Sequence, residues 1–142
     1  MSVQLDVRPI RVEGRSRLAV IGITVVAALA VWAILAPVAG IDLEAMQGSR
    51  QIHVGAGSVF FASAAMAFAG WGLLAFLERR SPNARKVWTI LAVSACILSL
   101  GSPLVGGVGI GAKLGLASLH LIVGATVILG LRRTALSATE RC

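Results

Sequence analysis

Four long runs without a charged residue organise this chain, and short charged segments separate them. The runs cover residues 18–41, 54–77, 87–112 and 114–131. An α-helix needs roughly 20 apolar residues to cross a bilayer; three runs contain about 24 or more, and the fourth contains about 18. The pattern therefore predicts an all-α membrane protein, a bundle of four transmembrane helices that run alternately up and down.

The composition agrees with a single membrane domain. Hydrophobic residues make up 57% of the 142 positions and charged residues 13%, whereas soluble domains average about 25% charged residues. A net charge of +7 would also suit a nucleic-acid binder, but the basic residues lie at the ends of apolar runs, without interleaved aromatic residues. The expected partners are membrane lipids, and no nucleic acid.

The basic residues also predict an orientation. Residues 78–86 form a charged block between the second and third runs, and Lys and Arg in short loops stay on the cytoplasmic side. On this assignment 11 of the 13 basic residues are cytoplasmic, and only Arg50 and Lys113 lie outside. Both termini are therefore expected in the cytoplasm.

The chain is expected to have three parts. These are a basic N-terminal segment at residues 1–17, a transmembrane domain at 18–131 and a tail at 132–142. The first run resembles a signal peptide, with small residues near Ala36 and Ala39 as a cleavage site, but signal-peptide cores span only about 7–15 residues. We interpret it as a span. The four spans are expected at about 18–40, 55–77, 84–104 and 112–131.

The segment between the first two spans predicts a small extracytoplasmic β-hairpin. Polar and apolar residues alternate on both sides of Gly48-Ser49, and a glycine in the first loop position suits a type II′ turn. This register places Glu44 opposite His53, and the apolar face should rest on the outer helix ends. An irregular loop is the alternative. The Glu44–His53 pair is a candidate site, either a surface pair or part of a metal or ligand site.

Small residues predict how the middle helices pack. The second span carries a stripe of them, and such stripes let helices approach closely in lipid. The third span should begin with Ser81 as N-cap and Pro82 as the first helical residue. It should turn small, weakly polar residues to the bundle and end or kink near Pro103, before a glycine-rich outer loop at 105–111. The two stripes are Gly55, Ser58, Ala62, Ala65, Ala69 and Gly72, and Thr89, Ala92, Cys96 and Ser99.

His120 is the one ionisable residue well inside a run, and such residues are functional candidates by default. It shares a helical face with Lys113, Ala117 and Gly124, which predicts a polar cavity open to the outer side. The alternative is a structural histidine bonded to a group on another helix or in the outer loop. The expected partners are Ser99, Ser102 or a carbonyl near Pro103.

The sequence offers no pattern for catalysis. It has no paired carboxylates within the runs, no supported Ser-His-Asp arrangement and no phosphate-binding motif. Cys96 and Cys142 lie at different depths, so no disulfide or metal site is expected, and a bis-histidine haem would need His53 and His120 at one depth. All six acids lie outside the spans, which counts against proton-coupled export. We expect no enzyme and no catalytic, cofactor-binding or metal-binding residue.

The chain from about Leu18 to Thr134 resembles a family of small four-span integral membrane proteins, mostly actinobacterial, of unknown function. The resemblance rests on Ala-Pro-Val-Ala-Gly-Ile-Asp-Leu at the end of the first span, Gly-Trp-x-Leu-Leu-Ala-x-Leu-Glu-Arg-Arg, Val-Trp-Thr, and Leu-His-Leu-Ile-Val-Gly before Leu-Arg-Arg-Thr. It implies a bacterial plasma membrane and brings no known activity. We expect a structural or accessory membrane subunit, with a membrane-protein partner or as a homo-oligomer, or a hydrophobic-ligand binder. A subunit of a small oligomeric transporter or channel is the alternative.

Overall fold

The computed structural model describes residues 14–135, so most of the predicted N-terminal segment and tail lie outside the described residues. Helices dominate it, and the two strands form one hairpin. The elements are α1 (Gly14–Ala33), the π-helical turn η1 (Ile34–Val38), β1 (Glu44–Gln47), β2 (Arg50–His53), α2 (Ala56–Arg80), α3 (Ala84–Ser99), α4 (Gly101–Gly106) and α5 (Gly109–Thr134).

Four helical segments within residues 14–135 are long and apolar enough to cross a membrane. Each has 23 to 26 residues, and mean hydropathy in their most apolar windows is 1.8 to 2.7. A helix in lipid satisfies its own backbone hydrogen bonds, which is why long apolar runs adopt this form. The predicted four-span fold is confirmed, and the chain is a multi-pass membrane protein. The segments are Gly14–Val38, Ala56–Arg80, Ala84–Gly106 and Gly109–Thr134.

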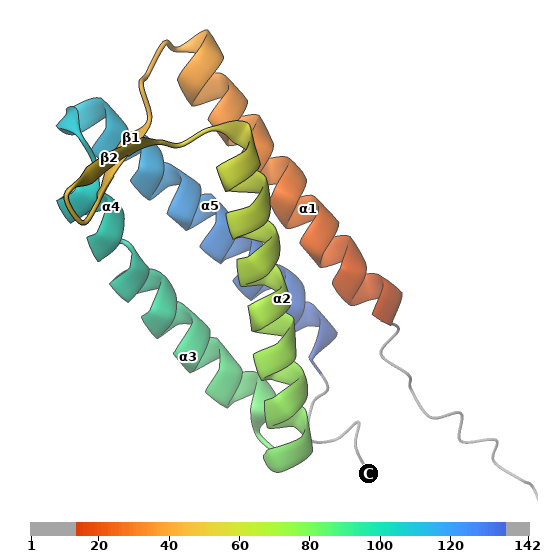
Figure 1. Cartoon of the computed structure of the whole chain (residues 1–142). Helices are drawn as coiled ribbons and strands as arrows, with labels where there is room; N and C mark the ends of the chain where they lie inside the picture. Colours follow the sequence, from red (N-terminus) through yellow and green to blue (C-terminus); the bar gives the residue numbers. More distant parts are fainter. Residues whose placement is uncertain (1–13, 136–142) are drawn as a thin grey trace, which may run out of the picture.

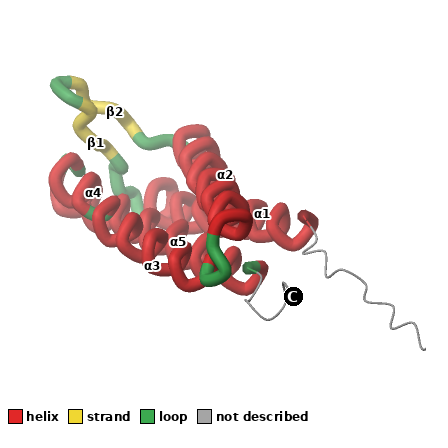
Figure 2. The backbone as a smooth tube through the Cα atoms, turned by 90° about the horizontal axis from the view of Figure 1, so that it is seen from below, coloured by secondary structure: helices red, strands yellow, loops and turns green. Residues whose placement is uncertain are grey.

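The helices run alternately up and down, so the connections gather at two ends (Figure 1). The terminal end holds the start of α1, the turn between α2 and α3, and the end of α5. The hairpin end holds β1, β2 and α4. Figure 2 shows the hairpin on the same side of the molecule as α4. α1 packs on α2 and α5, and α3 packs on α2 and α5 from the other side.

Two clusters of buried side chains hold the bundle together. The cluster in the terminal half includes Leu74, Trp88 and Leu131, all fully buried. The cluster toward the hairpin end is built around Ala28 and Leu43. Helix association in lipid depends on close packing, since lipid tails are as apolar as the side chains. The buried side chains therefore identify the positions at which the helices contact one another.

The hairpin has the predicted register. Glu44 pairs with His53 and Ala45 with Ile52. Gly48 has a φ of 64°, and no non-glycine residue among those described has a positive φ, so the turn has the glycine-first form expected of type II′. Leu43, just before β1, is fully buried, which places the apolar face on the helix ends as predicted.

The connection between α4 and α5 differs from the predicted outer loop. Val105 and Gly106 belong to α4, and α5 begins at Gly109, whose φ of 78° makes the turn between the helices. Gly107 forms a β-bridge with Ala45, and the Val108 N–H donates to the Glu44 carbonyl at 3.0 Å. Only about two residues leave helical geometry, because helix and hairpin contacts satisfy the backbone better than an open loop would.

The start of α3 also differs from the prediction. The helix begins at Ala84, after Asn83, and not at Pro82. Ser81 has an extended backbone, with φ −138° and ψ 134°, as the residue before a proline prefers. Its hydroxyl accepts a hydrogen bond from the Asn83 N–H at 3.2 Å, so it orders the turn between α2 and α3 and does not cap α3.

Candidate functional site

A cavity of about 480 Å³ lies between α2, α3 and α5. Its size falls within the range of about 300–1,000 Å³ that is typical of small-molecule sites. The lining is mostly apolar, with a few hydroxyls, one thiol and one imidazole. On α2 the lining residues run from Ser58 to Leu73, which at 1.5 Å per residue makes the cavity about 22 Å long.

The small residues of α2 form one wall of this cavity. Ser58, Ala62 and Ala69 line it, whereas two buried positions of α2 that lie outside the lining and contact neighbouring helices are Ala67 and Leu74. This stripe was predicted to bring helices together, but it lines an open space instead. A small side chain permits close packing only where a neighbour approaches, and beside these residues the space stays open.

The stripe on α3 does face the bundle, as predicted. Ala92, Cys96 and Ser99 line the cavity from that side. Gly124 of α5 lies directly against Cys96, since a Cβ added to the glycine would overlap with the cysteine Sγ. This contact sets how closely α3 approaches α5, and it leaves the cavity on the side of α2.

The cavity opens sideways, between α2 and α3. Met66 and Leu73 of α2 and Leu91 of α3 line it and remain 54%, 40% and 44% exposed. Residues that are both lining and exposed mark the opening. In a membrane, this side of the protein faces lipid chains.

Both ends of the cavity are covered. At the terminal end Trp88 is fully buried, and its Nε1–H donates to the Gly70 carbonyl at 3.0 Å. At the hairpin end the cover comes from β1 and α4, through Ala45, Pro103 and Gly106. Access is therefore lateral and not along the bundle axis.

His120 lines the cavity from α5. Its Nδ1 lies 2.8 Å from the Leu116 carbonyl of the same helix, so the expected partner on another helix or in the outer loop is wrong. The carbonyl four residues earlier is within reach of a helical side chain without any movement of a neighbouring helix. The hydroxyls of Thr24 and Ser63 make the same type of bond.

The other sequence candidates lie elsewhere. Lys113 is half-buried against Gly107 and outside the cavity lining, so the predicted polar face continues from His120 to Gly124 but does not include Lys113. Glu44 and His53 are paired on the hairpin, where the Glu44 carboxylate accepts a hydrogen bond from the Gln51 amide. Across residues 14–135, no three His, Cys, Asp or Glu side chains are grouped to hold a metal ion.

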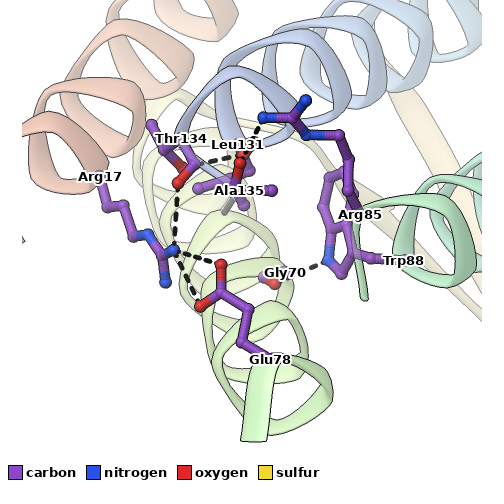
Figure 3. Close-up of polar contacts among 8 residues, drawn as sticks. All are labelled: Arg17, Gly70, Glu78, Arg85, Trp88, Leu131, Thr134 and Ala135. Atoms are coloured by element: carbon purple, nitrogen blue, oxygen red, sulfur yellow. Dashed lines mark hydrogen bonds and ion pairs between the residues drawn. The ribbon is translucent and has the colours of Figure 1, made fainter. Parts of the chain in front are cut away.

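A second polar cluster lies at the terminal end and was missed in the sequence. The Arg17 guanidinium donates to both carboxylate oxygens of Glu78, at 2.8 and 3.0 Å, and to the Thr134 carbonyl at 3.3 Å (Figure 3). From the other side, Arg85 donates to the Ala135 carbonyl. Two arginines thus bind the carbonyls at the C-terminus of α5, which have no partners within the helix.

Fold and cavity together define a class: a multi-pass membrane protein of four spans with a covered cavity that opens sideways. The chain belongs to DUF6069, a family of unknown function, whose sequence profile matches residues 8–137. The match confirms the resemblance inferred from the short motifs. No curated protein and no solved structure matches the chain.

Proposed function

We propose that this protein binds a lipophilic molecule in the cavity between α2, α3 and α5 and exchanges it with the surrounding lipid through the lateral opening. The observation that carries the proposal is the elongated, largely apolar cavity of about 480 Å³. An apolar cavity with few polar groups is the usual form of a small-molecule site. The role is binding, without a chemical step.

The cover at the hairpin end favours a small molecule over a helix from a partner protein. A transmembrane partner helix that lay along the cavity would meet the hairpin and α4 at one end. A single alkyl or polyprenyl chain can end within the cavity and avoids this obstacle.

The covered ends favour binding over conduction, the alternative function. A channel or transporter needs a path from one side of the membrane to the other. Trp88 closes the cavity at the terminal end, and β1 and α4 close it at the hairpin end. The lateral opening suits a molecule that arrives from the lipid phase.

Tryptophan fluorescence tests this binding, because Trp88 lies at the terminal end of the cavity and is shielded from surrounding lipid. Replacement of Trp32 and Trp71 by phenylalanine leaves Trp88 as the single reporter. In detergent micelles, a long-chain alcohol with bromine at the end of its chain should quench Trp88 with a saturable dependence on its mole fraction.

A matched pair of variants separates cavity binding from contact with the outer surface. Ala95→Phe fills the cavity and should weaken the saturable quenching at least about 10-fold, the equivalent of about 1.4 kcal/mol. Val93→Phe adds the same side chain to an exposed position of α3 outside the lining and should leave the quenching unchanged. Equal, non-saturable quenching in both variants and the parent would contradict the proposal.

For the location we propose the plasma membrane with both termini in the cytoplasm, supported by the basic residues of the terminal end. Eight of these lie within the described residues: Arg15, Arg17, Arg79, Arg80, Arg85, Lys86, Arg132 and Arg133. Cys142, in the tail outside the described residues, should then react with a membrane-impermeant maleimide only after intact cells are opened. As a control, Ser49→Cys in a Cys142→Ser background places a thiol in the hairpin turn and should react in intact cells. The reverse pattern would invert the orientation.

A further inference from the structure

We infer that the molecule bound in this cavity is an uncharged lipophile with a hydroxyl or amide N–H group, which it donates to Nε2 of His120. The inference rests on the proposed function and specifies the chemical class of the ligand. It depends on the hydrogen bonds of His120, on the chemistry of the rest of the lining and on the depth of the imidazole.

The Leu116 carbonyl fixes the hydrogen-bonding roles of the imidazole. A carbonyl oxygen only accepts hydrogen bonds, so Nδ1, at 2.8 Å from it, carries the proton. In the neutral ring Nε2 is then an acceptor. Within residues 14–135 no donor lies within bonding distance of Nε2. The imidazole therefore presents a free acceptor to the cavity from α5.

The other polar groups of the lining are less suited to a ligand. The Ser63 hydroxyl donates to the Val59 carbonyl at 2.7 Å, and the Ser99 hydroxyl donates to the Cys96 carbonyl at 2.8 Å. The other two lining serines, Ser58 and Ser102, are exposed residues near the hairpin end of the cavity. Among the lining residues there is no Lys, Arg, Asp or Glu. A carboxylate or phosphate would enter this cavity without a counter-charge, which is strongly unfavourable in apolar surroundings. The site therefore favours a neutral ligand.

The depth of His120 excludes the headgroup of an ordinary phospholipid. The residue is 11 positions from the first residue of α5, which is about 16 Å along the helix, and 14 positions from the last. Nε2 thus lies near the middle of the span, whereas phospholipid headgroups stay at the membrane surface. A small donor such as a hydroxyl can reach this depth, with the chain of the ligand toward Trp88.

The test compares three bromine-labelled probes of equal chain length in the protein with Trp88 as its only tryptophan. The probes are an alcohol, its methyl ether, which cannot donate, and the corresponding carboxylate. The alcohol should bind about 10-fold more tightly than the ether, as expected for one hydrogen bond inside an apolar site, and the carboxylate should bind more weakly than both.

Variants of His120 assign this preference to the imidazole. His120→Phe should bind the ether as the parent does and lose the preference for the alcohol. His120→Gln keeps an acceptor oxygen and should retain part of the preference for the alcohol. If His120→Phe fails to fold, the comparison of His120→Gln with the parent still tests the inference.

Two failures are distinguishable. Equal affinities for alcohol and ether in the parent, or an alcohol preference that survives in His120→Phe, would overturn this inference and leave the proposed function standing. The absence of saturable quenching with any probe would overturn the proposed function itself.

Discussion

Replacement of Arg17 by methionine is expected to lower the free energy of unfolding by about 3 kcal/mol, because it removes the guanidinium that donates to both oxygens of the Glu78 carboxylate. The two side chains are only 7% and 13% exposed, and the guanidinium also holds the Thr134 carbonyl at the end of α5. The loss therefore affects three helices, α1, α2 and α5. Reversible unfolding by SDS in mixed micelles, followed by circular dichroism, measures this change.

The double variant Arg17→Met with Glu78→Leu tests whether the broken ion pair is the cause. Replacing both members of a buried pair by apolar residues is often neutral, so the double variant should recover most of the stability lost in Arg17→Met. Arg79→Met removes an exposed arginine next to Glu78 and should change the free energy of unfolding by less than about 0.5 kcal/mol. If Arg17→Met behaved like Arg79→Met, the ion pair would contribute nothing to stability.

Gly130→Ala is the second substitution with a large expected effect, a loss of about 1–3 kcal/mol. An alanine Cβ at this position would lie 2.5 Å from Cγ1 of Val20 and 3.3 Å from its Cβ. Valine is short and stiff at χ1, so it cannot turn away, and α1 would have to separate from α5. The same SDS unfolding measurement detects the loss.

A glycine on α1 provides the matched control. A Cβ on Gly22 would meet nothing within 4 Å, so Gly22→Ala should leave the protein as stable as the parent or raise its stability by up to about 1 kcal/mol. Shortening the opposing residue should relieve the overlap, so Gly130→Ala with Val20→Ala should be more stable than Gly130→Ala alone. A loss of the same size at both glycines would mean that helix–helix contact is not responsible.

Length and charge in the sequence were enough to predict the four spans. A run of about 24 uncharged residues has few stable forms in a bilayer other than a helix. The hairpin register was predictable because alternation has a period of two and Gly48 fixes the turn. Both signals are local in the chain, and local signals can be recognised without knowledge of the packing.

Features that depend on distant segments could not be predicted in this way. Arg17 and Glu78 are 61 positions apart, and each was interpreted as part of a charged helix end. The stripe through Ala62 and Ala69 correctly marks a distinct face of α2, but the sequence does not say whether a helix or a cavity lies beside it. For His120, the sequence placed the side chain inside the span but did not reveal that its own helix supplies the partner.

The β-bridge between Ala45 and Gly107 has a consequence for the order in which the protein is assembled during synthesis. β1 and β2 leave the ribosome with the first two helices, but Gly107 and Val108 follow only after the third membrane segment. Until then, the hydrogen bond from the Val108 N–H to the Glu44 carbonyl cannot form. The cover at the hairpin end is therefore completed late, and the cavity is closed at this end only when the start of α5 has been synthesised.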